Sequence, residues 1–166
     1  SGGHRTAARL LSCGMSEGRY LAPLAMDRLD RYALVGTGSI DAITADSANT
    51  ASAFLTGHKS SVNAIGVYAD RTPDPLDDPR HETLAEYLRA HTTKSVGIVS
   101  DAEVVDATPA SVVAHTRRRD AKEYIATALF DLKPEVLLGG GGAYFLPRAT
   151  PGSKRRDERA LVDEFQ

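Results

Sequence analysis

The sequence has a single cysteine and lacks any long apolar run. Cys13 has no second cysteine to pair with in the 166 residues, so an internal disulfide is excluded. No apolar stretch approaches the length of a membrane span, and the start of the chain lacks the charged-then-apolar pattern of a signal peptide. We therefore expect no membrane-spanning segment and no membrane partner.

The chain also lacks an excess of charge of one sign. Twenty Lys and Arg residues stand against 22 Asp and Glu residues, for a formal net charge of -2. This balance does not favour binding to nucleic acid or to an anionic membrane surface. The length predicts one domain with a sizeable core, and no internal repeat is present. Because the chain starts at Ser1 without methionine, we expect a piece of a longer protein, with ordinary processing as the alternative.

Helix and strand patterns alternate along the chain, which is typical of an α/β protein with a parallel sheet. We expect helices over 4–11, 82–90 and 120–130, and strands over 32–35, 94–100 and 134–138. In the helix over 82–90, Leu84, Ala85 and Leu88 are expected to face inward, and the strand over 94–100 is expected to be buried. Residues 64–68 are expected to be a short strand or extended loop, and the proline-rich residues 71–79 a loop. In the tail, Ala160, Leu161, Val162 and Phe165 are spaced for one helical face, and residues 154–156 are expected to form a solvated basic face.

Residues 44–57 indicate a loop that turns into a helix of small side chains. Asp46 and Ser47 are both good N-cap residues, and Gly57 is suited to end the helix in a left-handed turn. A hydroxyl at such a helix start lies among unpaired amides at the positive end of the dipole, where phosphate binds and a serine oxyanion is stabilised. Ser47 is therefore a candidate nucleophile, with simple capping as the alternative.

A second candidate constellation follows the strand predicted over 94–100. Ligands of open α/β sheets bind beyond the carboxyl ends of strands, which places residues 101–110 well for a site. Thr108 and the proline after it indicate a helix start, and we expect this helix to run past His115 toward Arg119. Without further information, Asp106 reads as a helix-start carboxylate and Arg119 as a surface charge.

Histidines and glycines offer weaker candidates. His115 lies beside apolar residues, so we expect a buried, hydrogen-bonded side chain rather than a metal ligand. His4, His58, His81 and His91 show no paired ligand spacing. The glycine run 139–142 follows a strand, yet it lacks the Gly-Lys-Ser/Thr of a phosphate-binding P-loop, so a tight strand exit competes with a phosphate site.

Two segments together resemble one family. Residues 44–59, with Thr-x-Asp-Ser-Ala closed by Thr-Gly-x-Lys, resemble the nucleophile segment of bacterial alkaline phosphatases. Residues 106–119, with Asp-Ala-Thr-Pro-Ala followed by Ala-His and a basic end, resemble the segment of that family that holds magnesium and grips the phosphoryl group. The resemblance implies an alkaline-phosphatase-like α/β sandwich with a mostly parallel central sheet flanked by helices. Residues 1–166 would be a single partial catalytic domain, truncated at both ends.

The resemblance also implies a role for each site residue. Ser47 would attack phosphorus, form a phosphoserine and contact zinc, and Asp46 would orient the site by holding Arg119. Asp106 and Thr108 would be magnesium ligands. The phosphate-binding arginine lies thirteen positions after that aspartate, which gives Arg119, with Arg117 or Arg118 as alternatives if the register slips.

The family uses two zinc ions and one magnesium ion, and most of their ligands have no counterpart here. The resemblance begins just past the Asp-Gly-Met-Gly strand whose Asp binds metal, and the remaining Asp, His and Glu ligands fall beyond Gln166. We therefore expect an inactive fragment of a phosphatase that acts on small phosphate monoesters. The resemblance further implies a possible homodimer and a periplasmic or secreted location.

Two other classes of protein remain open. One is a phosphodiesterase or sulfatase of the same superfamily, against which the match of both segments argues. The other is a non-catalytic phosphate-binding or interaction protein that uses Ser47 and Arg119 as an anion pocket without zinc. Phosphate binding that chelators leave unchanged would favour the binding protein, and a chelator-sensitive phosphoserine would favour the enzyme.

Overall fold

The computed structural model describes residues 28–31, 33, 35–70 and 72–165. The chain divides into two compact units, Ser1–Thr37 and Gly38–Gln166. In the first unit, the helix expected over 4–11 lies outside the described residues, as do Tyr32 and Leu34 of the expected strand. Ala33 and Val35 are described and lie in no strand.

Two parallel strands form the sheet of the second unit. β1 (Gly97–Glu103) pairs with β2 (Val136–Gly140) in a register that sets Ile98 opposite Leu137. Both strands begin two or three residues later than the sequence predicts. The reason lies in the residues just before the strands. The N–H of Glu135 donates to the carbonyl of Val96 at 3.0 Å, and the N–H of Val96 donates to the carboxylate of Glu135 at 2.7 Å, so a side chain takes part in the pairing there. The parallel α/β arrangement expected from the alternating pattern is confirmed.

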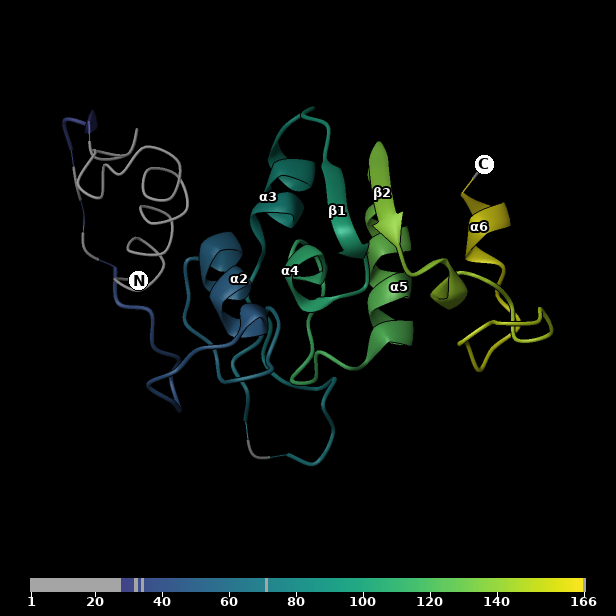
Figure 1. Ribbon diagram of the computed structural model, residues 1–166, viewed down its shortest axis with the longest axis horizontal. Coiled ribbons are helices and arrows are strands. Elements are labelled where there is room, and N and C mark those ends of the chain that lie inside the picture. The colour runs from purple at the N-terminus through teal and green to yellow at the C-terminus, as the bar shows by residue number, and fades with distance from the viewer. Residues whose placement is uncertain (1–27, 32, 34, 71, 166) are drawn as a thin grey trace, which may run out of the picture. The chain divides into compact units, whose positions relative to one another are not determined.

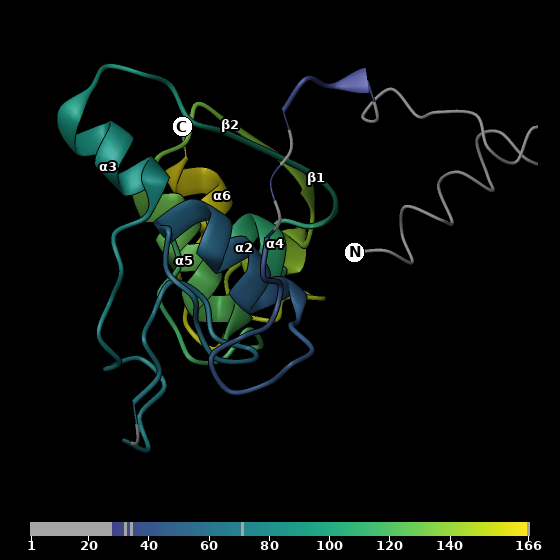
Figure 2. The same ribbon diagram turned by 90° about the vertical axis from the view of Figure 1, so that its left-hand side faces the viewer.

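Helices cover one face of this sheet (Figures 1 and 2). They are α2 (Ser47–Thr56), α3 (Leu84–His91), α4 (Ala107–Ala110), α5 (Lys122–Leu132), α6 (Leu161–Glu164) and a 3-10 turn, η2 (Gly142–Tyr144).

The core lies between sheet and helices, where Ile98 of β1 packs with Ile125 and Leu129 of α5. Val99 and Leu138 alternate to the other face and are 72% and 59% exposed. The strand over 94–100 was expected to be buried, and that expectation is wrong for its outer face. No helix within the described residues is long and apolar enough to cross a membrane.

A capping box starts α3. The Thr83 hydroxyl accepts the N–H of Glu86 at 3.2 Å, and the Glu86 carboxylate accepts the N–H of Thr83 at 2.8 Å. Ala85 is buried as the predicted apolar face requires, but Leu84 is 51% exposed. Leu84 was expected to point inward, and this is wrong because the face that turns inward carries Ala85 and the Glu86 carboxylate, which bonds to His115.

The helix expected from Thr108 to Arg119 is much shorter in the structure. α4 ends at Ala110, and Thr116 instead forms an antiparallel bridge with Ile65, with both N–H···O distances at 2.8–2.9 Å. β-branched residues after Ala110 weaken the helix, and the bridge supplies the backbone partners that a longer helix would have supplied. The expected extended segment 64–68 is present as this bridge and a second one between Val67 and Arg80.

The C-terminal tail departs from its prediction at two places. Arg155 was expected on a solvated basic face, but it is 4% exposed, pairs with Asp157 at 2.6 Å and donates to the carbonyl of Tyr144 at 3.1 Å. A buried guanidinium with several acceptors is a structural group rather than a free surface charge. In α6, Leu161 is fully buried while Val162 is 50% exposed, so the expected single apolar face is only partly present.

The ion pair that precedes the sheet gives a pH prediction. The carboxylate of Glu135 accepts hydrogen bonds from both terminal guanidinium nitrogens of Arg89, at 2.7 and 2.8 Å. These bonds, together with the one from the Val96 N–H, lower the pKa of Glu135 from 4.5 to about 2. A carboxylate with a depressed folded-state pKa stabilises the fold fully above its unfolded pKa of 4.5 and loses that effect as pH falls toward 2.

We therefore expect the difference in melting temperature between wild type and Glu135→Gln to be small but positive at pH 6 and to vanish near pH 2. Thermal unfolding followed by circular dichroism across this range measures it. Glu82→Gln, at an exposed glutamate beside α3, is the control and should show no such trend. A difference that is the same at pH 6 and pH 2 would refute the assignment.

Candidate functional site

The first turn of α2 presents Ser47 as the sequence predicts. Asp46 is the N-cap: its carboxylate accepts the N–H of Asn49 at 3.1 Å, and the Asn49 side chain accepts the N–H of Asp46 at 3.1 Å. Gly57 ends the helix at a φ of 75°, the left-handed conformation expected there. The predicted helix and both of its ends are confirmed.

Small side chains let α2 pack closely against α4. Ala48 and Ala51 are buried on the inner side of α2. The hydroxyl of Ser52 is buried too, donates to the carbonyl of Ala48 at 2.8 Å and accepts the N–H of Gly66 at 3.0 Å. The helix that carries Ser47 is thereby fixed to the segment that carries the second constellation.

The backbone of residues 63–65 holds Arg119 next to the start of α2. The N–H of Arg119 donates to the carbonyl of Asn63 at 3.0 Å, just beyond the bridge between Ile65 and Thr116. The backbone N–H of Asn63 in turn donates to the Asp46 carboxylate at 3.3 Å. Two segments more than fifty residues apart in sequence are therefore held in one register.

The guanidinium of Arg119 joins the two predicted constellations. Its Nη1 donates to the Ser47 hydroxyl at 2.8 Å and to the Asp46 carboxylate at 3.2 Å. Its Nη2 donates to Asp106 at 3.1 Å. Four residues that were singled out in the sequence, from α2, the cap of α4 and the loop before α5, therefore lie in direct contact.

This cluster is open to solvent and carries net negative charge. The side chains of Asp46, Asp106 and Arg119 are 21%, 42% and 30% exposed, so a small ligand can reach them. Two carboxylates against one guanidinium leave a charge of about -1. A dianionic phosphate alone would meet repulsion here, whereas a cation beside Asp106 would offset it.

The Asp106 carboxylate remains ionised well into the acid range. Partial burial opposes its charge, but the N–H of Ala107, the guanidinium of Arg119 and the ammonium of Lys122 together outweigh burial and lower the pKa of Asp106. An ionised carboxylate is the form that binds a hard cation.

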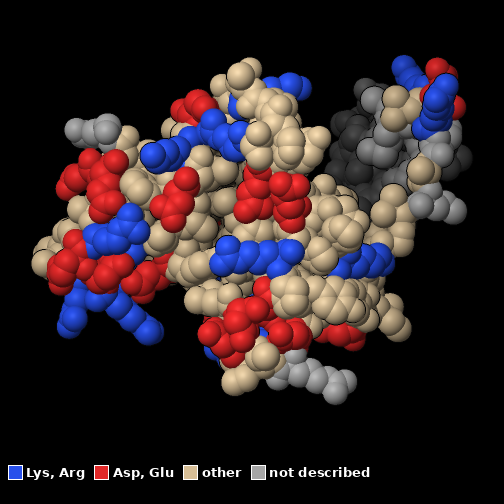
Figure 3. Space-filling view, turned by 180° about the vertical axis from the view of Figure 1, so that it is seen from behind, with Lys and Arg blue, Asp and Glu red and all other residues tan. Residues whose placement is uncertain are grey.

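Lys122 is a charged neighbour of the site that the sequence analysis missed. Its ammonium pairs with Glu103, which raises the pKa of Lys122 further, and Asp106 adds to the effect. Its position three residues after Arg119 could have indicated that it lies near the site. Lys122 begins α5, however, and from the sequence alone it would be interpreted as an ordinary charge on a helix. On the face shown in Figure 3, Lys and Arg groups likewise alternate with Asp and Glu groups.

The other residues that were predicted for the site are Arg117, Arg118 and Thr108, and none of them contacts Ser47 through a hydrogen bond in the described residues. Arg117 turns away and donates to the carbonyl groups of Asp70 and Thr72, so Arg119 is the arginine that faces Ser47. Arg118 has no side-chain hydrogen bond or ion pair within the described residues. Thr108 lies exposed in the first turn of α4, two residues after Asp106, and makes no hydrogen bond through its hydroxyl to the described part of the chain.

The donors at this site fit magnesium better than zinc. The Asp106 carboxylate and the Thr108 hydroxyl, which is unpaired within the described residues, are hard oxygen donors of the kind that Mg²⁺ takes, and both lie at the start of α4. Zinc prefers several His, Cys or carboxylate ligands. Within the described residues, the one group of three such side chains with donor atoms close together is Asp70, Asp77 and Asp78 in another loop.

The remaining histidine and glycine candidates have structural roles. His115 is 4% exposed, and its ring nitrogens lie 2.8 Å from the carbonyl of Gly66 and 2.8 Å from Glu86, as expected for a buried, hydrogen-bonded side chain. Gly141 has a φ of 92° at the exit of β2, and a Cβ on Gly139 would lie 2.7 Å from Val104. The tight strand exit is therefore the reading that the backbone supports.

Comparison with known proteins gives the same family throughout. A family model described as alkaline phosphatase matches residues 3–166. The tissue-nonspecific alkaline phosphatase of Gallus gallus is 34% identical over 164 residues, covering 87% of this chain and 32% of the chicken protein. The cold-active alkaline phosphatase of the psychrophile Shewanella sp. has a TM-score of 0.72 at 27% identity, covering 96% of this chain and 35% of that one. A mutant of the TAB5 alkaline phosphatase with Mg bound in its M3 site has a TM-score of 0.69 at 25% identity, covering 97% of this chain and 41% of that one.

The fold of the described residues is therefore that of an alkaline phosphatase, an α/β protein with parallel strands and flanking helices. The chain belongs to the alkaline phosphatase family, as the two sequence segments indicated. It spans between 32% and 41% of the length of the relatives named above.

Proposed function

We propose that this chain is the nucleophile-bearing part of a metal-dependent phosphomonoesterase that works through a phosphoserine. The observation that carries the proposal is the 2.8 Å contact between the Ser47 hydroxyl, at the start of α2, and the guanidinium of Arg119. A serine nucleophile and a phosphate-binding arginine must be neighbours, so that both can reach the same phosphoryl group. Family membership supports the same reaction.

Each residue has a distinct task in this proposal. Arg119 places two parallel N–H groups against phosphoryl oxygens, and Asp46 positions the guanidinium by accepting a hydrogen bond from its Nη1. The Ser47 oxygen forms a bond to phosphorus while the ester P–O bond breaks and the alcohol leaves with a proton. Water then cleaves the Ser47–phosphorus bond, releasing phosphate and restoring the hydroxyl. The N-terminus of α2 favours the developing negative charge throughout.

Asp106 and Thr108 are the residues that would hold magnesium. When bound there, Mg²⁺ would supply positive charge and a more acidic bound water. Two zinc ions, with Ser47 as one ligand, remain part of the proposal by family resemblance, and the other ligands are not among the described residues. Substrates would be small phosphate monoesters, and a homodimer in the periplasm or outside the cell is proposed on the same ground.

We predict that the purified 166-residue chain hydrolyses p-nitrophenyl phosphate at a negligible rate with zinc and magnesium present. The reason is that the described residues around Ser47 hold no free base, since Asp46 and Asp106 are both paired with Arg119, and no group of His, Cys, Asp or Glu side chains that could bind zinc. A serine hydroxyl without activation is a weak nucleophile. Robust hydrolysis by this chain, abolished by a chelator, would show the prediction to be wrong.

The proposed function is tested on the complete reading frame. Sequencing the encoding DNA past both ends of the chain gives that frame, and its product is assayed for p-nitrophenyl phosphate hydrolysis and for a phosphoserine on Ser47. Activity and phosphoserine that EDTA removes are the expected results. Phosphate binding that EDTA leaves unchanged, without hydrolysis, would favour the phosphate-binding protein instead. The net charge of about -1 at the cluster argues against such metal-free binding.

A further inference from the structure

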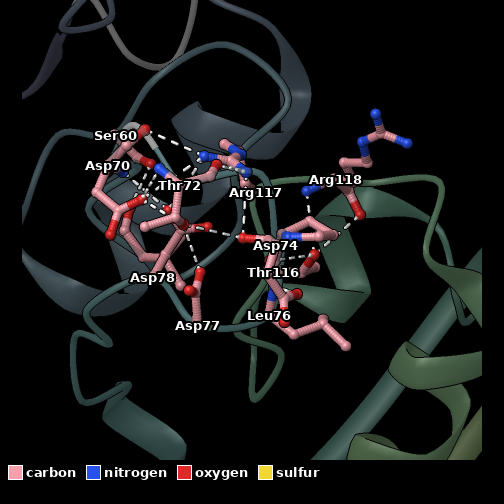
Figure 4. Close-up of polar contacts among 12 residues, drawn as sticks. Ser60, Asp70, Thr72, Asp74, Leu76, Asp77, Asp78, Thr116, Arg117 and Arg118 are labelled. Atoms are coloured by element: carbon pink, nitrogen blue, oxygen red, sulfur yellow. Dashed lines mark hydrogen bonds and ion pairs between the residues drawn. The ribbon is translucent and has the colours of Figure 1, made fainter.

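The loop between the bridges of residues 65–67 and α3 gathers three carboxylates. One carboxylate oxygen from each of Asp70, Asp77 and Asp78 lies within 4.8 Å of the other two. Thr72 sits among them: its hydroxyl is 2.8 Å from Asp70 and 2.7 Å from Asp77 (Figure 4). A hydroxyl has one hydrogen, so it can donate to only one of these two oxygens at a time.

Asp78 is the buried member of this acidic loop cluster. Its side chain is fully buried, and the residue as a whole is 2% exposed. Oδ1 accepts the N–H of Asp70 at 2.8 Å, whereas Oδ2 is buried and has no hydrogen-bond partner among the described residues. A buried carboxylate oxygen without a partner is costly and calls for a ligand.

The charges around the cluster leave room for a divalent cation. Arg117 is the described cation next to it, with Nη1 at 3.7 Å from Asp70 and 3.6 Å from Asp78. These distances exceed those of hydrogen bonds, because the guanidinium instead donates to the carbonyl groups of Asp70, Thr72 and Asp74. Among the described side chains, three carboxylates against one guanidinium leave a charge of about -2.

We propose that Asp70, Asp77 and Asp78 bind a hard divalent cation of the Ca²⁺ class. Carboxylate oxygens from a loop are the ligands that Ca²⁺ takes, and its flexible coordination suits an irregular backbone and leaves places for water. The ion would give the orphaned Oδ2 of Asp78 its partner and offset the charge of the cluster. Arg117 then has a structural role, because it donates to the loop carbonyl groups of Asp70, Thr72 and Asp74. This inference is independent of the proposed function.

Calorimetric titration of the purified chain with Ca²⁺ tests the site, together with thermal unfolding in Ca²⁺ and in EGTA. We expect binding of one Ca²⁺ to this loop and a higher melting temperature in Ca²⁺. Asp77→Asn and Asp78→Asn should each weaken this binding at least tenfold and remove the thermal shift. Asp77 is exposed, so its variant remains informative if Asp78→Asn fails to fold, which circular dichroism reports.

Two controls separate this site from the cluster around Arg119. Asp74→Asn changes an exposed carboxylate of the same loop that is outside the three and caps the N–H of Leu76, a bond that asparagine keeps. Asp106→Asn removes the proposed magnesium ligand. Both variants should keep Ca²⁺ binding and the thermal shift. Absence of Ca²⁺ binding by the wild type at millimolar concentration, or binding lost in Asp106→Asn and kept in Asp77→Asn, would overturn the proposal.

Discussion

Replacing Ser47 with alanine in the protein encoded by the complete reading frame should abolish the phosphoenzyme and lower hydrolysis of p-nitrophenyl phosphate by at least about 10³-fold. Alanine lacks the oxygen that would bond to phosphorus, so no covalent intermediate can form. Helix α2 should persist, because its cap is the carboxylate of Asp46 and not the serine hydroxyl. Mass spectrometry of the trapped phosphoenzyme and a steady-state assay measure the two effects.

Ser61→Ala is the matched control for this prediction. Ser61 is a half-buried serine whose hydroxyl makes no hydrogen bond within the described residues, so its replacement should leave both readouts near wild type. If Ser47→Ala retained a phosphoserine, the nucleophile would lie elsewhere. If it retained activity but lost the phosphoserine, direct attack by water would replace the proposed two-step route.

The sequence predicted the candidate site because its chemistry is encoded in short segments. The cap at Asp46, the left-handed end at Gly57 and the burial of His115 each depend on a few neighbouring residues, and the structure shows all three. The family resemblance, rather than the local pattern, predicted that Asp106 and Arg119 act together, and their side chains are in contact. Their chemical roles remain predictions.

Long-range contacts explain what the sequence could not predict. The helix after Thr108 was overextended, because only the fold shows that Thr116 bridges to Ile65. Arg155 read as a surface charge, since its partner Asp157 and the acceptor on Tyr144 become visible only when the tail folds back. The orphaned oxygen of Asp78 is likewise a property of burial, which a proline-rich acidic loop does not suggest.

Replacing Arg119 with alanine in the complete protein is expected to lower hydrolysis by about 10²–10³-fold, the usual cost of losing one donor to the transition state. The effect has two physical sources. The phosphoryl oxygens lose their parallel N–H donors. In addition, the net charge of the cluster changes from about -1, with Arg119 present, to about -2 for Asp46 and Asp106 alone, which repels a dianionic substrate. Arg119→Lys keeps the charge without the planar fork, so its activity should lie between alanine and wild type.

Steady-state kinetics and inhibition by inorganic phosphate separate these sources. Loss of the positive charge should weaken inhibition by phosphate in Arg119→Ala, whereas Arg119→Lys, which keeps the charge, should retain more of this inhibition. Loss of the planar guanidinium should lower kcat in both variants. Arg118→Ala is the control, since the Arg118 side chain makes no ion pair within the described residues and should be dispensable. Because Arg119 also joins α2 to α4, circular dichroism must show that each variant is folded. Equal activity of Arg119→Ala and Arg118→Ala would remove Arg119 from the proposed site, and a selective loss in Arg118→Ala would move the phosphate-binding role one residue along the chain.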